Sequence, residues 1–231
     1  MLSVAKAICQ LFLVSALCLG FGGPLHSDEH SEGKVARRLQ GRWNMAKQSN
    51  VAEKRVSGKG FVWFGADKAI VLETEDGGYS GTWSAVLTNG MPAIVLDGNE
   101  EDLIRIRFYG DNKLSLVSEN STHDDCPVFE HEVNPPPLDE RSAHMLGSWR
   151  VQLLNDKPNQ ETNAVCVFYP QHVFVLTEKY MTSFGDWRLT RGLWKTYLML
   201  GKTDYAISFK GTNSFYAIER DGNDKLLFIR H

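Results

Sequence analysis

The sequence predicts an all-β protein made of two tandem eight-stranded antiparallel up-and-down barrels. The first observation is an internal repeat, because Leu39-Gln40-Gly41-Arg42-Trp43 recurs as Met145-Leu146-Gly147-Ser148-Trp149. The second is that short runs rich in Val, Ile, Phe and Tyr end repeatedly at Gly, Asn or Asp, which is typical of strands. The third is that the turns are of hairpin length, and closing such a sheet into a barrel removes its exposed edges.

The repeat continues well beyond this opening motif. Gly81-Thr82-Trp83 matches Gly185-Asp186-Trp187, and Phe64 matches Phe168. Apolar positions therefore match apolar positions, and a turn glycine matches a turn glycine. We interpret the two halves as two copies of one structural unit.

Strands are predicted in the same order in both units. In the first unit they cover 41–48, 59–64, 69–75, 79–87, 92–97, 103–109, 113–118 and 126–132. In the second they cover 147–154, 163–168, 172–178, 183–190, 194–200, 204–209, 213–219 and 225–230. The segment 103–108 alternates apolar and polar residues, which predicts a half-buried antiparallel strand. Short helices are predicted at Lys34–Leu39 and at Asp139–Leu146.

The domain boundaries follow from composition. Residues 1–27 have a Lys, an apolar stretch and a break at Gly20–Pro24, which predicts a secretory signal peptide cleaved after Ser27 or after Gly20. The apolar stretch 7–21 is shorter than the roughly 20 residues of a membrane span. The first barrel is expected at 34–133, a Pro-rich linker at 134–138, and the second barrel at 139–231.

The motifs Gly41-x-Trp43 and Gly147-x-Trp149 resemble the Gly-x-Trp signature on the first strand of lipocalins and related calycins. The Leu-Gln-Gly-x-Trp opening also resembles an uncharacterised lipocalin-like domain family of planctomycete secreted proteins. The resemblance implies that each Trp closes a barrel floor and that an Arg from the last strand covers it. Arg230 stands at that place in the second unit, whereas His131 stands there in the first.

Sequence patterns for catalysis, metals and cofactors are absent. The chain has no Gly-x-Ser-x-Gly, His-Glu-x-x-His or Cys-x-x-Cys, so we expect no enzyme, no cofactor and no metal site. The cluster His123 to Cys126 and the acidic loop 97–102 are interpreted as solvated turns. With a net charge of −3 and scattered basic residues, a nucleic-acid-binding surface is not supported.

Two pairs of residues remain as candidates for special roles. Trp63 and Trp83 are the tentative ligand-binding residues, with simple packing as the alternative. Cys126 and Cys166 either form a disulfide between the two units, which export would permit, or remain two independent buried thiols.

Three functions are compatible with this pattern. The first is a secreted or periplasmic binding module that holds a small hydrophobic ligand, and the alternative is a protein-interaction or inhibitor module with filled barrels. A hidden hydrolase ranks last. If a barrel admits a ligand, we expect the first, because its strand ends carry small residues where the second unit has larger ones. These are Gly58, Gly60, Gly77, Gly78 and Gly90, against Asn163, Met181, Thr182 and Trp194.

Overall fold

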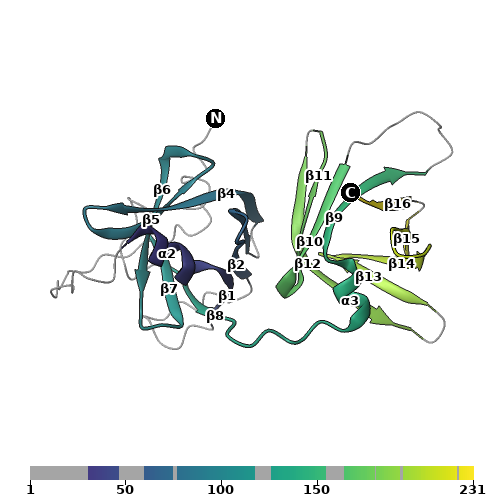
Figure 1. Cartoon of the computed structure of the whole chain (residues 1–231), viewed down its shortest axis with the longest axis horizontal. Coiled ribbons are helices and arrows are strands. Elements are labelled where there is room, and N and C mark those ends of the chain that lie inside the picture. Colours follow the sequence, from purple (N-terminus) through teal and green to yellow (C-terminus); the bar gives the residue numbers. More distant parts are fainter. Residues whose placement is uncertain are drawn as a thin grey trace. The chain divides into compact units, whose positions relative to one another are not determined.

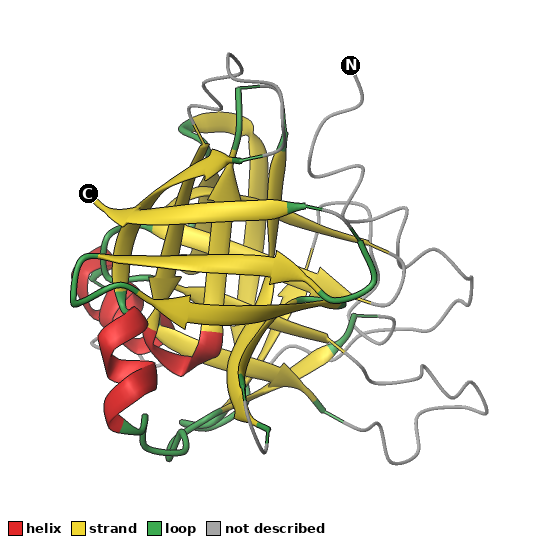
Figure 2. Ribbon diagram, turned by 90° about the vertical axis from the view of Figure 1, so that its right-hand side faces the viewer, coloured by secondary structure: helices red, strands yellow, loops and turns green. Residues whose placement is uncertain are grey.

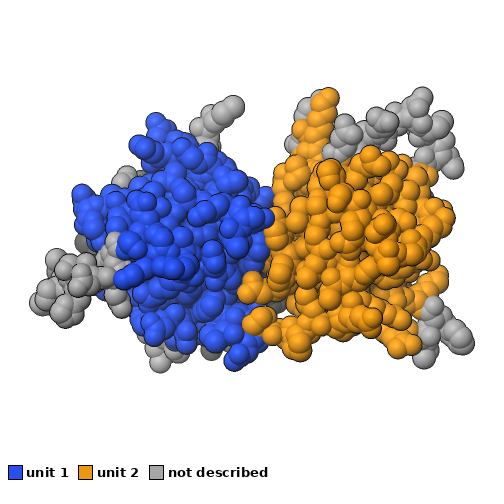
Figure 3. Space-filling model, viewed as in Figure 1, with its two compact units in different colours: residues 1–134 blue, residues 135–231 orange. Residues whose placement is uncertain are grey.

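The chain divides into two compact units, residues 1–134 and 135–231 (Figure 3). The computed structural model describes residues 31–46, 60–74, 77–117, 126–154, 164–179, 181–192, 195–222 and 224–231. The expected signal peptide lies outside these residues. So do the turn at 123–125, Gly58, Asn163 and Trp194.

The first unit is a closed antiparallel barrel in which each strand pairs with its neighbours in the chain and β1 also pairs with β8 (Figure 1). It is preceded by helix α2 (Glu32–Leu39). Its strands are β1 (Gly41–Met45), β2 (Gly60–Phe64), β3 (Ala69–Thr74), β4 (Gly77–Thr88), β5 (Met91–Leu96), β6 (Asn99–Phe108), β7 (Lys113–Val117) and β8 (Val128–His131).

The second unit repeats this plan, with β9 paired to both β10 and β16. Helix α3 (Glu140–Met145) precedes it, and a short 3-10 turn, η2 (Pro170–His172), joins its second and third strands. Its strands are β9 (Gly147–Leu153), β10 (Ala164–Tyr169), β11 (Val173–Thr177), β12 (Thr182–Arg191), β13 (Thr196–Leu200), β14 (Thr203–Phe209), β15 (Ser214–Glu219) and β16 (Lys225–Arg230).

The prediction of two tandem eight-stranded up-and-down barrels is confirmed. Strands dominate the described chain and the helices are two short segments (Figure 2). The main difference from the expected strands is the length of β4. Its first half pairs with β3, from Gly77 to Thr82, and its second half pairs with β5, from Trp83 to Thr88. A single strand that serves two neighbours in succession has to be longer than either of them.

Both helices begin and end in the same way. Ser31 caps α2 by accepting a hydrogen bond from the Lys34 amide, and Asp139 caps α3 by accepting one from the Ser142 amide. Hydrogen bonds from the Ser142 side chain and backbone lower the pKa of Asp139. After each helix the chain turns into the barrel at Gly41 (φ 113°) or Gly147 (φ 108°), a conformation that favours glycine.

Each barrel has its own apolar core. In both units alternate residues of the strands point inward, and these pack against apolar residues of the preceding helix. Val35 and Leu39 of α2 belong to the first core, and Met145 of α3 belongs to the second. The helix therefore contributes to the interior of its barrel at one end, which we call the floor.

Among the described residues, no helix is long and apolar enough to cross a membrane.

Candidate functional site

The floor of the second barrel is built around Trp149. This side chain is fully buried, and its indole Nε1 donates a hydrogen bond of 2.7 Å to the carbonyl oxygen of Met145 at the end of α3. The guanidinium of Arg230 lies 4.4 Å from the centre of its ring. Arg230 also donates to the carbonyls of Leu146 (3.1 Å) and His144 (2.5 Å). The predicted contact between Arg230 and Trp149 is therefore present.

The floor of the first barrel has the same plan with a different covering residue. Trp43 is fully buried and donates to the carbonyl of Leu39 at 2.7 Å. The His131 ring lies over it with 4.5 Å between ring centres, and its Nε2 is 3.3 Å from the carbonyl oxygen of Gln40. His131 pairs with Trp43 in the sheet, as Arg230 pairs with Trp149. Histidine therefore occupies the place of the arginine.

A second covering residue sits on each helix, and here the residue types are exchanged. In the first unit Arg38 lies 3.9 Å from the centre of the Phe108 ring and donates to the carbonyl of Gly110. In the second unit the matching residue is His144. Its ring is 5.9 Å from that of Phe209, and its Nε2 is 3.0 Å from the carbonyl oxygen of Thr212. Each floor thus holds one arginine and one histidine, in opposite positions.

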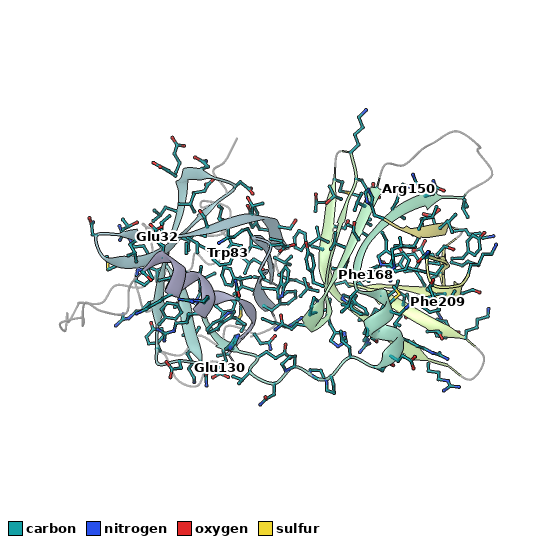
Figure 4. The ribbon with its side chains drawn as sticks, in the orientation of Figure 1. Glu32, Trp83, Glu130, Arg150, Phe168 and Phe209 are labelled. Atoms are coloured by element: carbon teal, nitrogen blue, oxygen red, sulfur yellow. The ribbon has the colours of Figure 1, made fainter. Side chains whose placement is uncertain are left out.

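The interior of the second barrel contains a continuous set of aromatic contacts. Phe215 stacks on Phe228 with 4.4 Å between centres and an interplanar angle of 9°. Phe215 also contacts Trp149 at 5.0 Å and Phe209 at 5.6 Å. On the other side Phe168 lies 6.3 Å from Phe228 and 5.3 Å from Trp187. These rings come from six different strands, so they span the barrel at this level, and Figure 4 labels Phe168 and Phe209 among them.

The first barrel has fewer rings at the matching level. Phe64 and Trp83 form an edge-to-face pair at 5.1 Å, as Phe168 and Trp187 do in the second unit. Leu114 pairs with Phe129 at the position where Phe215 pairs with Phe228. Both residues are fully buried in the core of the first unit. The first interior is therefore apolar but carries a smaller side chain at this position.

The structure does not bring Trp63 and Trp83 together as one site. Trp83 belongs to the interior core, and its Nε1 donates to the carbonyl of Gly65 at 3.3 Å. Val62 and Phe64 also belong to that core, so strand alternation directs Trp63 to the outer face of the wall. Trp63 is nevertheless buried, and its ring lies directly against Gly65.

The glycines expected to leave room at the entrance of the first barrel have other causes. A Cβ at Gly60 would lie 2.5 Å from the carbonyl oxygen of Glu73, so glycine is required there by close strand packing. Gly90 has a φ of 75° in the β4–β5 turn, where a side chain would be strained. Neither position supports the argument from small residues.

Cys126 and Cys166 are thiols and not a disulfide. Cys166 is fully buried within the core of the second barrel, and burial raises the pKa of its thiol. A sulfur from the first unit would have to enter that core to reach it. The disulfide between units is therefore replaced by its alternative, two buried thiols.

One polar cluster was not singled out in the sequence. The Tyr79 hydroxyl donates to Asp97 Oδ2 at 2.5 Å, and the Thr82 amide and hydroxyl donate to Asp97 Oδ1 at 2.8 and 3.1 Å. Burial, followed by the hydrogen bond to Asp97, raises the pKa of Tyr79. Asp97 thereby ties the β5–β6 turn to β4. Within the described residues no group of His, Cys, Asp and Glu has the arrangement of a metal site.

Comparisons with known protein families, curated proteins and solved structures found no match. The two-barrel architecture therefore stands on the strand pairing of this chain alone.

Proposed function

We infer that this protein is an extracytoplasmic binding module that engages another protein through the outer surface of its filled barrels. The aromatic set inside the second barrel is the observation that carries this proposal. Truncating one buried aromatic ring in a core costs about 3–5 kcal/mol. A ligand that displaced Phe215 or Phe228 would have to offset a cost of this size before it gained any affinity.

The outer wall of the second barrel offers a surface suited to such a role. Tyr216 and Leu227 pair on neighbouring strands, and Ile218 beside them is 47% exposed. Lys210 and Lys225 lie 4.7 and 5.0 Å from the centre of the Tyr216 ring. Tyrosine is enriched at protein interfaces, where an apolar ring and a polar hydroxyl are both used. We assign the contact surface to this outer face of β15 and β16.

A small apolar ligand in the first barrel is the second candidate. It is favoured by Leu114, which occupies less space than Phe215 does in the second unit. Such a ligand would meet an apolar lining that includes Trp83, Phe64 and Phe129. The lipocalin-like resemblance of the repeat motif also supports this candidate, and the predicted signal peptide supports export in both cases. No catalytic role is proposed.

Native mass spectrometry of the protein purified from its own host separates these two candidates. The interaction proposal expects a complex with a second protein, which Ile218→Asp weakens at least tenfold. Leu114→Phe serves as the matched control, because it fills the first interior and leaves the outer wall unchanged. A bound species of a few hundred daltons that Leu114→Phe removes would contradict the interaction proposal and support the ligand.

Tryptophan fluorescence provides the second measurement. The whole protein is titrated with fatty acids and with a hydrophobic dye, alongside Leu114→Phe and Phe215→Leu. The interaction proposal expects no saturable quenching in the wild type. Saturable quenching that Leu114→Phe abolishes would instead place an apolar site in the first barrel.

A further inference from the structure

We propose that the floor of the first barrel is a pH-dependent latch, in which His131 does on protonation what Arg230 does permanently in the second barrel. The proposal is independent of the function inferred above. It rests on two matched floors within one chain, one covered by an imidazole and the other by a guanidinium.

The two covering residues use equivalent partners. His131 Nε2 lies 3.3 Å from the carbonyl oxygen of Gln40, and Arg230 Nη1 donates to that of Leu146 at 3.1 Å. Gln40 and Leu146 occupy the same place, the C-cap of the helix before the barrel. The C-terminal end of a helix carries partial negative charge and favours a cation. A protonated imidazole therefore suits this carbonyl better than a neutral one.

The ring beneath each covering residue points the same way. A cation within about 6 Å of an indole face is attracted by the electron density of the ring. Arg230 has this interaction with Trp149 at 4.4 Å. His131 stands 4.5 Å from Trp43, with 38° between the ring planes, so protonation would give the first floor the same attraction.

The charged groups around His131 on the described elements are arranged as ion pairs. Arg38 of α2 pairs with Asp111 of the β6–β7 turn at 3.6 Å. Arg42 of β1 pairs with Glu132 at 3.9 Å, and Lys113 of β7 pairs with Glu130 at 2.7 Å. Arg37, in the last turn of α2, is exposed to solvent, which screens its charge. The pairs largely cancel, so the Trp43 ring and the Gln40 carbonyl decide which form of His131 is favoured.

The direction of the pH effect follows from this geometry. Because the folded floor favours the imidazolium, its stabilisation is fully present below about pH 6.5, where an unfolded imidazole titrates. It is lost as the pH rises and the folded imidazole releases its proton. The guanidinium of Arg230 stays charged throughout this range, so the latch of the second barrel does not change.

Hydrogen exchange of the whole protein, read by mass spectrometry of peptides from each unit, tests the latch at pH 5.5 and pH 8.0. After correction for intrinsic exchange rates, peptides from β1 and β8 should be protected about tenfold more at pH 5.5, the size of a favourable cation–π contact. Peptides from β9 and β16 should change much less. His131→Gln keeps a neutral donor and should remove the pH difference, and His131→Arg should give high protection at both pH values.

Arg230→His and His144→Gln complete the design. Arg230→His should transfer the pH difference to the peptides of the second unit, and His144→Gln should leave the first unit unaffected. The latch is refuted if β1 and β8 show no pH difference beyond that of β9 and β16. It is equally refuted if His131→Gln retains the difference. The two His131 variants decide the matter even if Arg230→His fails to fold.

Discussion

Replacing Trp149 by alanine removes the centre of the second floor, and the structure indicates the size of the effect. A buried Trp truncated to Ala costs about 3–5 kcal/mol. Trp149 also has an aromatic contact with Phe215, a typical contribution of about 0.5–1.5 kcal/mol, and a hydrogen bond to Met145, typically about 1 kcal/mol. It supports the guanidinium of Arg230 as well. These terms are parts of the truncation cost, and together they place the expected loss near the upper end, about 5 kcal/mol.

Urea unfolding of the whole protein measures this loss, and hydrogen exchange of peptides from each unit shows which barrel is affected. Trp149→Phe is the matched control, because it keeps a ring against Phe215 but removes the indole donor. We expect that variant to lose about 1–2 kcal/mol, since it leaves the Met145 carbonyl without this partner. A loss below about 1 kcal/mol for Trp149→Ala, or a loss confined to the first unit, would refute the assignment of Trp149 as the floor residue.

Three further predictions concern single positions. Gly147→Ala should destabilise the protein by about 1–3 kcal/mol, because φ is 108° there, whereas Gly33→Ala should stabilise α2 by about 0.5 kcal/mol, because nothing lies within 4 Å of its added Cβ; thermal unfolding of both variants checks the contrast. The pKa of Tyr216 is lowered by the hydrogen bond from Lys210, and burial raises those of Tyr79 and Tyr205. Ultraviolet titration should therefore lose its part below pH 10 in Tyr216→Phe. Tyr79 favours the neutral phenol, so its stabilisation is present below about pH 10 and is lost at higher pH, and a Tyr79→Phe protein whose stability falls equally steeply in alkali would contradict this. Cys166 should stay unmodified by a thiol reagent in the native protein and react only after unfolding, as peptide mapping of the alkylated residue would show.

Residues missed in the sequence share one feature, which is that their partners are distant along the chain. Asp97 is bound by Tyr79 and Thr82 only because β4 and the β5–β6 turn are adjacent in the sheet. The exchange of arginine and histidine between the floors was partly visible, since His131 had been matched to Arg230. Matching Arg38 to His144 would have completed it, because both directly precede the last residue of the helix-end motif.

The sequence by itself determined the duplication, the sixteen strands and their neighbour-to-neighbour order. These features depend on short-range patterns: alternation with a period of two, turn residues at strand ends, and a repeated Gly-x-Trp motif. Alternation did not show that Trp63 lies outside the wall and Trp83 inside it, because both strands are apolar at successive positions. The tertiary structure decided this, and it also placed Cys166 in a core closed to Cys126 and filled the second barrel with rings from six strands. Such contacts depend on how the strands close around one interior, and no local pattern in the chain encodes that closure.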